Sequence, residues 1–149
     1  MRYISSDPRT DRDILLRGNS LSLVSIDELQ KLPLRNLFIE EKDLVIADLV
    51  RNYFEAVSKR WPEAWNFMGR GLMLNKTNGF RAIMRIFRPA YLYCAAPGDL
   101  VETGDFLQLF SRAQFEDEHF TTELFPPGSS GESALYHALN QALLVEFEE

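Results

Sequence analysis

The sequence predicts a mainly α-helical protein: a single compact domain of about five helices with little or no sheet. Three observations support this. Apolar residues repeat at spacings of three and four, helix-capping residues precede several of these stretches, and the alternating patterns typical of strands are scarce. A length of 149 residues fits one domain, and a hydrophobic fraction of 46% supplies enough side chains for a core.

The first 20 residues are expected to form a poorly ordered, charged lead-in. Residues 7–17 (DPRTDRDILLR) carry charges of both signs at high density, which is typical of a solvated chain end. Residues 21–25 show a short alternating pattern that fits either a strand or an extended lead-in. Ser25 and Glu28 match a capping box, so a short helix is expected to follow. The single helical domain is predicted to span residues 21–149.

The clearest predicted helix covers residues 40–60. Pro62 suits the first position of a further short helix over 63–67. We expect Trp61 and Trp65 to fill the core where these two helices meet. The apolar face of the long helix repeats every three or four residues and includes Leu44, Val50, Phe54 and Val57.

A second long helix is expected from residue 79 to residue 87. Thr77 or Asn78 can cap it, and the preceding residues 72–76 fit either a short extended piece or the beginning of this helix. Pro89 is expected to end it, because proline has no backbone N–H to donate. Its apolar stripe consists of Phe80, Ile83, Met84 and Phe87.

The last third of the chain is expected to hold two more helices. Thr103 can cap the first of them, and the acidic run at 116–123 is expected to be solvated. Residues 126–131 (PPGSSG) predict a loop or hinge before the last helix. Ser129 and Glu132 form a second capping box at the beginning of that helix.

Charge is sorted along the sequence. Residues 59–88 hold seven basic residues and one acidic residue, a net charge of +6. Residues 89–149 hold one basic and eleven acidic residues, a net charge of −10, whereas the whole chain carries −6. A basic, aromatic-rich centre thus lies within an acidic chain, and such a centre can meet an anion.

The candidate site residues belong to this basic centre. Arg81, Arg85 and Arg88 lie four and three positions apart, so they share a helix face that differs from the apolar stripe. Lys76 stands at the expected beginning of the same helix, where backbone amides can hold a phosphate. The predicted anion-binding or nucleic-acid-binding set is Arg70, Lys76, Thr77, Asn78, Arg81, Arg85 and Arg88.

The sequence is compatible with three roles for this basic helix face. It can contact nucleic-acid phosphates, with Trp61, Trp65 and Tyr91 near enough in sequence to stack on bases. It can be a solvated face, or it can pair with the acidic C-terminal segment of its own chain or of a neighbour. The acidic segment argues against nucleic acid, because charge folded within about 10 Å repels a polyanion.

The sequence does not support several other classes of function. Cys94 is the single cysteine, and His119 and His137 lie in different segments, so neither a disulfide nor a structural zinc site is expected. No apolar run approaches the roughly 20 residues that cross a bilayer, and the first residues show no signal-peptide pattern. No nucleophile, base and orienting residue stand at usable spacing. We therefore expect a cytoplasmic, non-enzymatic protein without a cofactor, a metal ion or a membrane partner.

Three segments, taken in order, resemble one family. They are residues 52–65 (NYFEAVSKRWPEAW), 74–84 (LNKTNGFRAIM) and 128–136 (GSSGESALY). Their order is similar to the C-terminal part of DGQHR-domain proteins, the group that includes the Dnd-type regulators of DNA phosphorothioate modification. The segments cover about a third of the chain, and the DGQHR pentapeptide itself is absent. The resemblance implies a bacterial DNA-modification or phage-defence setting and transfers no catalytic residue.

These observations favour a non-enzymatic helical module that contacts nucleic acid or a partner protein through its basic helix face. The alternative is a self-associating protein-interaction domain, in which the basic face pairs with an acidic C-terminal segment and the hinge near 126–131 lets the last helix dock on a neighbour.

Overall fold

Helices dominate the structure, which confirms the predicted fold class. The computed structural model describes residues 3–144, and in that range the chain forms eight α-helices, one 3₁₀ helix and one isolated β-bridge, between Leu72 and Thr121. The short helices raise the number above the expected five. The elements are α1 (Pro8–Leu16), α2 (Ile26–Leu29), α3 (Arg35–Ile39), α4 (Asp43–Arg60), α5 (Pro62–Asn66), α6 (Thr77–Cys94), α7 (Thr103–Ser111), η1 (Asp117–His119) and α8 (Ser129–Leu144).

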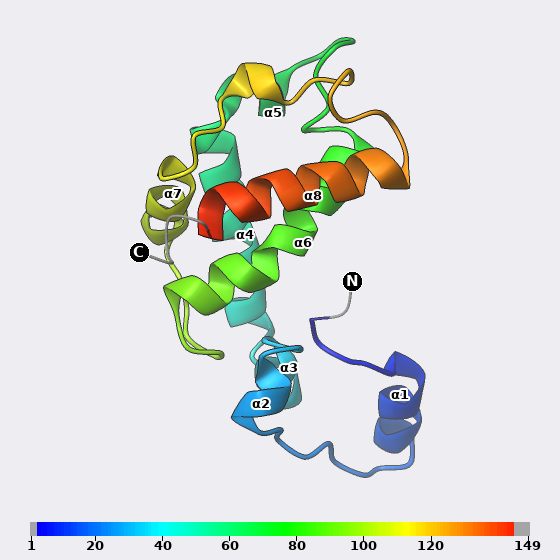
Figure 1. The fold of residues 1–149 in the computed structure, drawn as a ribbon. Helices are drawn as coiled ribbons and strands as arrows, with labels where there is room; N and C mark the ends of the chain where they lie inside the picture. The colour runs from blue at the N-terminus through cyan, green and yellow to red at the C-terminus, as the bar shows by residue number, and fades with distance from the viewer. Residues whose placement is uncertain (1–2, 145–149) are drawn as a thin grey trace.

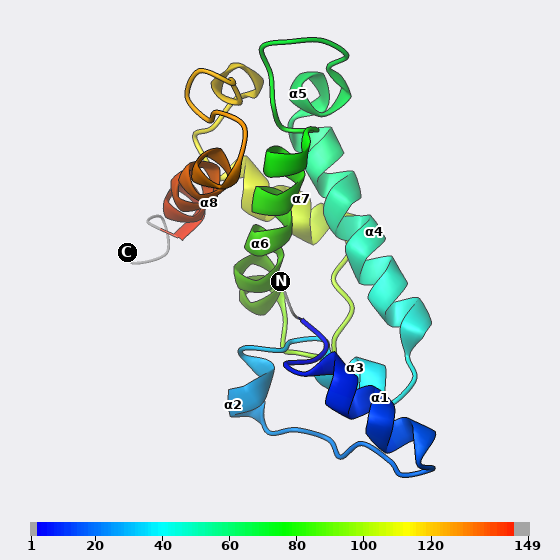
Figure 2. The same ribbon diagram turned by 90° about the vertical axis from the view of Figure 1, so that its right-hand side faces the viewer.

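Four of the longer helices form the body of the molecule (Figure 1). In this body, α4 packs mainly against α7, and α6 packs mainly against α8. Helices α1, α2 and α3 lie together at one end and α5 lies at the other, as both views show (Figures 1 and 2). We call residues 3–42, which carry α1 to α3, the N-terminal lobe. Among the helices of the described residues, none combines the length and apolarity that crossing a bilayer requires.

Tyr53 on α4 is the centre of the aromatic core. Its side chain is fully buried, and its ring centroid lies 5.1 Å from that of Phe87 on α6 and 5.3 Å from that of Phe106 on α7. Its hydroxyl donates a hydrogen bond to the backbone carbonyl of Ile83. Three helices are thus tied to one side chain, and the depth of burial keeps the pKa of the Tyr53 hydroxyl well above its usual value.

Helix α6 continues through Pro89 to Cys94, so the prediction that Pro89 ends it was wrong. Proline cannot donate the N–H that would bond to the carbonyl four residues earlier, at a cost of about 3 kcal/mol. Burial of the following turn offsets this cost. Tyr91 is fully buried, its ring stacks on Phe87 at 5.6 Å, and its hydroxyl donates to the carbonyl of Asp99 at 2.7 Å.

The charged lead-in is more ordered than expected, because it contains α1. Asp7 accepts a hydrogen bond from the backbone N–H of Thr10 and caps the helix, and Pro8 occupies its first position. No residue of α1 is buried. The helix is held by the carboxylate of Asp11, which accepts two hydrogen bonds from the guanidinium of Arg35 on α3. A long-range ion pair of this kind leaves no local signal in the sequence.

The segment at 21–25 has no regular secondary structure and joins no sheet. Its backbone is held by the side chain of Asn36, whose oxygen accepts from the N–H of Val24 at 2.9 Å and whose amide donates to the Val24 carbonyl at 3.2 Å. The predicted cap at Ser25 is confirmed, since its hydroxyl accepts from the N–H of Glu28 at 3.5 Å. The strand alternative for residues 21–25 was therefore wrong.

Trp61 fills the core as predicted, and the acidic run before Phe120 helps to hold it there. Trp61 is fully buried and donates its indole N–H to the carbonyl of Phe115 at 2.6 Å. Asp117 accepts a hydrogen bond from the N–H of Ala64 at 2.8 Å, and Glu116 lies 3.2 Å from Arg60. Most of the acidic run is exposed, as predicted, and Glu116 and Asp117 also contact the end of α4 and the backbone of α5.

Candidate anion-binding site

The first turns of α6 and α8 meet at one pocket with a volume of about 250 Å³. Four of the seven predicted site residues line it, namely Lys76, Thr77, Asn78 and Arg81. The rest of the lining comes from the loop before α6, from the segment that leads into α8 and from the first turn of α8: Met73, Thr122, Pro127, Gly128, Ser129 and Glu132. The structure thus joins two stretches that lie about 50 residues apart in the sequence.

Close backbone packing fixes the two helix ends. A Cβ at Gly79 would lie 2.7 Å from the carbonyl carbon of Leu74, and a Cβ at Gly131 would lie 2.8 Å from the carbonyl carbon of Pro126. The carbonyl oxygen of Pro126 also accepts a hydrogen bond of 3.0 Å from the side-chain amide of Asn78. Glycine is therefore required at both positions, and Pro126 links the beginning of α6 to the beginning of α8.

The predicted caps of α6 were wrong. Thr77 is the first helical residue, Lys76 is the N-cap, and neither Thr77 nor Asn78 makes a capping hydrogen bond with its side chain. The amide of Asn78 is buried against Pro126, and this tertiary contact takes the place of the expected local one. Thr103 likewise lies inside α7, whose N-cap is Glu102.

The electrostatics of the pocket favour an anion. A helix beginning carries partial positive charge on its free N–H groups, and here two such ends face one space. Lys76 and Arg81 are exposed, and neither makes an ion pair with another described residue. Glu132 is the one acid that lines the pocket, and its carboxylate lies 3.8 Å from the guanidinium of Arg85.

Arg85 points into the interface between α6 and α8, which contradicts its prediction as part of an outward basic face. Its guanidinium lies 4.1 Å from the ring centroid of Tyr136 and donates a hydrogen bond of 3.4 Å to the hydroxyl of Ser133. With the Glu132 ion pair, three side chains of α8 surround it. The helical spacing that placed Arg85 beside Arg81 and Arg88 says nothing about which neighbouring helix covers that face.

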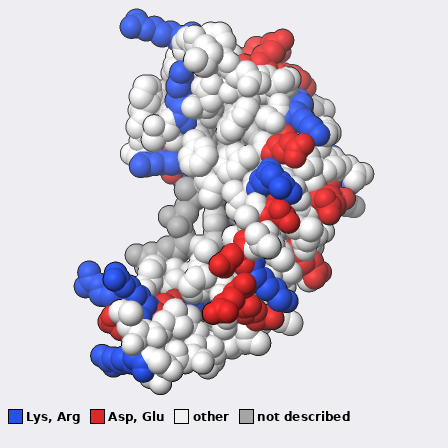
Figure 3. Space-filling model, turned by 180° about the vertical axis from the view of Figure 1, so that it is seen from behind, with Lys and Arg blue, Asp and Glu red and all other residues white. Residues whose placement is uncertain are grey.

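Two other predicted residues lie outside the pocket. Arg70 is exposed in the loop between α5 and α6, and Arg88 is exposed nearly two turns along α6 from Arg81. Seen from behind, Lys and Arg side chains lie at several heights along the left edge, whereas most Asp and Glu side chains lie on the right, with Lys and Arg side chains among them (Figure 3). Exposed basic residues of this region therefore include two that do not line the pocket.

The aromatic residues expected to stack on bases are mostly inaccessible. Trp61 and Tyr91 are fully buried, and Trp65 is half-buried against Phe54 at a centroid distance of 5.8 Å. Phe80, placed by its spacing on the core stripe, is 46% exposed and stacks on Phe54 at 5.2 Å with an interplanar angle of 7°. Phe80 directly precedes Arg81, so it is the exposed aromatic residue next to the site that the sequence interpretation missed.

Other chemistries find less support in the described residues. Burial, together with the charge of Asp105, raises the pKa of Cys94 to about 11, so its sulfur is a thiol rather than a nucleophilic thiolate at neutral pH. Within residues 3–144, no three His, Cys, Asp or Glu residues are grouped as metal ligands. Comparison of the chain with protein-family models, with curated proteins and with solved structures finds no match. The resemblance to DGQHR-domain proteins therefore stays a prediction.

Proposed function

We propose that this chain is a non-enzymatic binding module that contacts nucleic-acid phosphates through the pocket between α6 and α8. The supporting observation is the convergence of two helix beginnings around one space of about 250 Å³, together with Lys76 and Arg81, which make no ion pair within residues 3–144. That volume suits a phosphate group rather than a whole nucleotide, because pockets for larger ligands run from about 300 Å³ upward.

The charges near the pocket support a phosphate of a polymer. Arg85 and Glu132 neutralise each other, so Lys76 and Arg81 leave a local charge of about +2 beside the two helix ends. Arg70 and Arg88 are exposed in the loop before α6 and further along α6, and they can contact flanking phosphates. Contacts of this kind are independent of base sequence and weaken steeply with salt.

The test is fluorescence anisotropy with labelled duplex and single-stranded DNA at two or more salt concentrations. Arg81→Ala should weaken binding and lower the slope of log Kobs against log salt by about one. The matched control is Lys31→Ala, because Lys31 is an exposed basic residue of the N-terminal lobe that does not line the pocket. This variant should leave the slope unchanged. Absence of binding at low salt, or an Arg81→Ala slope equal to that of the wild type, contradicts the proposal.

A second candidate function is self-association. Within one chain, the basic helix face already contacts an acidic residue of the C-terminal segment, because Arg85 pairs with Glu132 on α8. The predicted hinge at 126–131 is shorter than expected, because α8 begins at Ser129. If the segment at 126–128 opens, the same contact can form between two copies. Light scattering after size exclusion at low and high salt tests this, and a monomer under all conditions contradicts it.

The DNA-modification or phage-defence setting is also part of the proposal, on the resemblance alone. A DGQHR-bearing coding segment directly upstream of this one supports it. An upstream segment without any such element removes its basis.

A further inference from the structure

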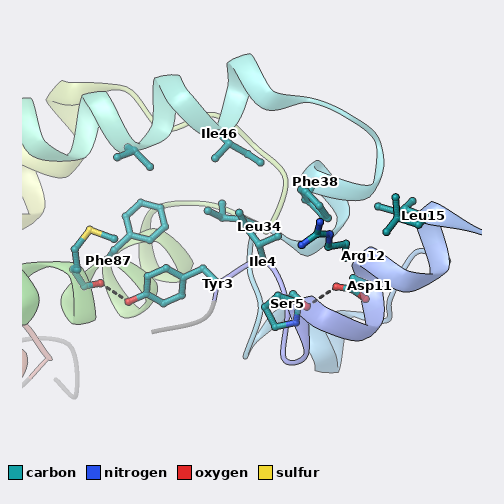
Figure 4. A pocket seen from close by; sticks show the side chains of 14 residues that line it. Tyr3, Ile4, Ser5, Asp11, Arg12, Leu15, Leu34, Phe38, Ile46 and Phe87 are labelled. Carbon is teal, nitrogen blue, oxygen red and sulfur yellow. Dashed lines mark hydrogen bonds between the residues drawn. The ribbon is translucent and has the colours of Figure 1, made fainter. Parts of the chain in front are cut away.

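A second cavity lies between the N-terminal lobe and the helical body, and it shares no residue with the anion pocket. Its volume is about 610 Å³, which falls in the range of about 300–1,000 Å³ that is usual for small-molecule sites. Helices α1, α3, α4 and α6 contribute to its walls, together with the segments before α1 and α3 (Figure 4). This cavity has no part in the proposed phosphate contact.

The walls are mostly apolar. Ile46 from α4, Phe87 from α6 and Phe38 from α3 face the cavity, and Leu34 and Ile4 lie between them (Figure 4). Water in such a space finds few hydrogen-bond partners, so an apolar occupant displaces it favourably.

Helix α1 forms one side of the cavity without being packed into the core. Leu15 and Leu16 both line the cavity and are 48% and 73% exposed. The ion pair between Asp11 and Arg35 holds the helix in place instead of apolar contacts. An occupant of the cavity would cover Leu15 and Leu16. This would explain why two apolar side chains are exposed on a helix rich in charged residues.

Among the polar side chains of the lining, Arg12 alone has no hydrogen bond or ion pair within residues 3–144. Tyr3 donates to the carbonyl of Met84, and Ser5 donates to the carboxylate of Asp11, which Arg35 neutralises. Arg12 reaches from α1 toward Phe38 at the opposite end of the cavity from Phe87 (Figure 4). The cavity is therefore apolar along its length, with one uncompensated positive charge at its α1 end.

We propose that this cavity binds an amphiphilic small molecule with an anionic head, such as a medium-chain or long-chain carboxylate. The head lies at Arg12, which can donate two parallel hydrogen bonds to a carboxylate. The alkyl chain runs between α4 and α6 toward Phe87 and covers Leu15 at the entrance.

The volume favours a small molecule over a peptide helix. A helix is about 10 Å across and rises 1.5 Å per residue, so it needs roughly 120 Å³ per residue, and the cavity would accept little more than one turn. Occupation of the cavity by a second copy of this chain, or by another protein, is therefore an alternative that the test distinguishes.

The test is isothermal titration of the full chain with dodecanoate, dodecanol and dodecyltrimethylammonium, each below its micelle concentration. Dodecanoate is expected to bind with a stoichiometry of one and more tightly than the other two. Arg12→Ala should weaken dodecanoate binding about tenfold and leave dodecanol binding unchanged. Arg9→Ala is the matched control, because Arg9 is exposed on the same helix and does not line the cavity.

A second pair of variants checks the location. Val50→Trp fills the cavity from α4 and should abolish binding of dodecanoate and dodecanol, with circular dichroism to verify the fold. Leu44→Trp on the same helix is the control, since Leu44 is 82% exposed and does not line the cavity.

Four results overturn the proposal. They are no saturable binding of dodecanoate, equal affinity of the wild type and Arg12→Ala for it, tighter binding of the cationic amphiphile, and unchanged binding in Val50→Trp. Dimerisation that Val50→Trp abolishes, without binding of any amphiphile, assigns the cavity to a second copy instead.

Discussion

Replacing Gly131 with alanine places a methyl group against the backbone that leads into α8. The added Cβ would lie 2.8 Å from the carbonyl carbon of Pro126, closer still to its oxygen, and 3.0 Å from the carbonyl carbon of Phe125. Backbone atoms cannot rotate away as a flexible side chain can. The helix or the segment must therefore move until the contact reaches about 3.5 Å.

The magnitude follows from three contributions. Overpacking against backbone costs about 2 kcal/mol. The movement also breaks the 3.0 Å hydrogen bond from Asn78 to Pro126, which is worth about 1 kcal/mol. The better helix propensity of alanine returns about 0.5 kcal/mol near a helix end. We expect Gly131→Ala to lower the free energy of unfolding by about 2.5 kcal/mol, and Tm by about 8 °C for a chain of this size.

Urea denaturation and thermal melts measure this effect, and Gly104→Ala is the matched control. Gly104 is the second residue of α7, and a Cβ there meets no atom within 4 Å. The control should gain about 0.5 kcal/mol, so the same substitution has opposite signs at the two positions. A Gly131→Ala protein as stable as the wild type would refute the close approach of α8 to Pro126 and with it the geometry of the anion pocket.

Two further predictions concern side chains that hold distant segments together. Asp11→Asn breaks the mostly buried ion pair with Arg35 and should lower the free energy that holds α1 in place by about 2 kcal/mol. This loss corresponds to an increase of about 30-fold in the rate of trypsin cleavage of α1. Arg35 lowers the pKa of Asp11, so the wild-type α1 should stay attached above pH about 4 and detach as the pH falls toward that lowered pKa. Equal cleavage of the wild type and Asp11→Asn would contradict the role of this ion pair. Asn52→Leu leaves the carbonyl of Val101 without its 2.9 Å hydrogen bond and should lower the free energy of unfolding, measured in urea, by about 2 kcal/mol. The control Asn66→Leu, at an exposed position, should lower it by less than about 0.5 kcal/mol. Equal losses of stability in the two variants argue against a role for the Asn52 hydrogen bond.

The sequence predicts helices best where an apolar face repeats over several turns. The expected helix at 40–60 corresponds to α4, and Trp61 lies in the core as its position after that helix suggests. The same periodicity fails at the helix ends. Leu44 was placed on the apolar face and yet is 82% exposed, whereas Val45 and Ile46 in the same turn pack against the core.

Local rules were wrong where a tertiary contact outweighs them. Pro89 breaks an isolated helix, but burial of Tyr91 carries α6 past it. Asn78 was expected to cap α6, but its side chain donates to the carbonyl of Pro126 instead. Asn78 and Pro126 lie 48 residues apart, so no local window of sequence contains both partners.

For the candidate site, the sequence alone determined which residues carry positive charge and that Lys76 and Arg81 stand near a helix beginning. Charge and spacing are properties of one segment, so they can be derived without a fold. Only the tertiary structure decided that α8 covers Arg85, leaves Arg81 open and brings its own first turn to the same pocket. The physical reason is that packing between helices depends on the shapes of two surfaces at once, here on glycines that let each helix end approach a backbone carbonyl.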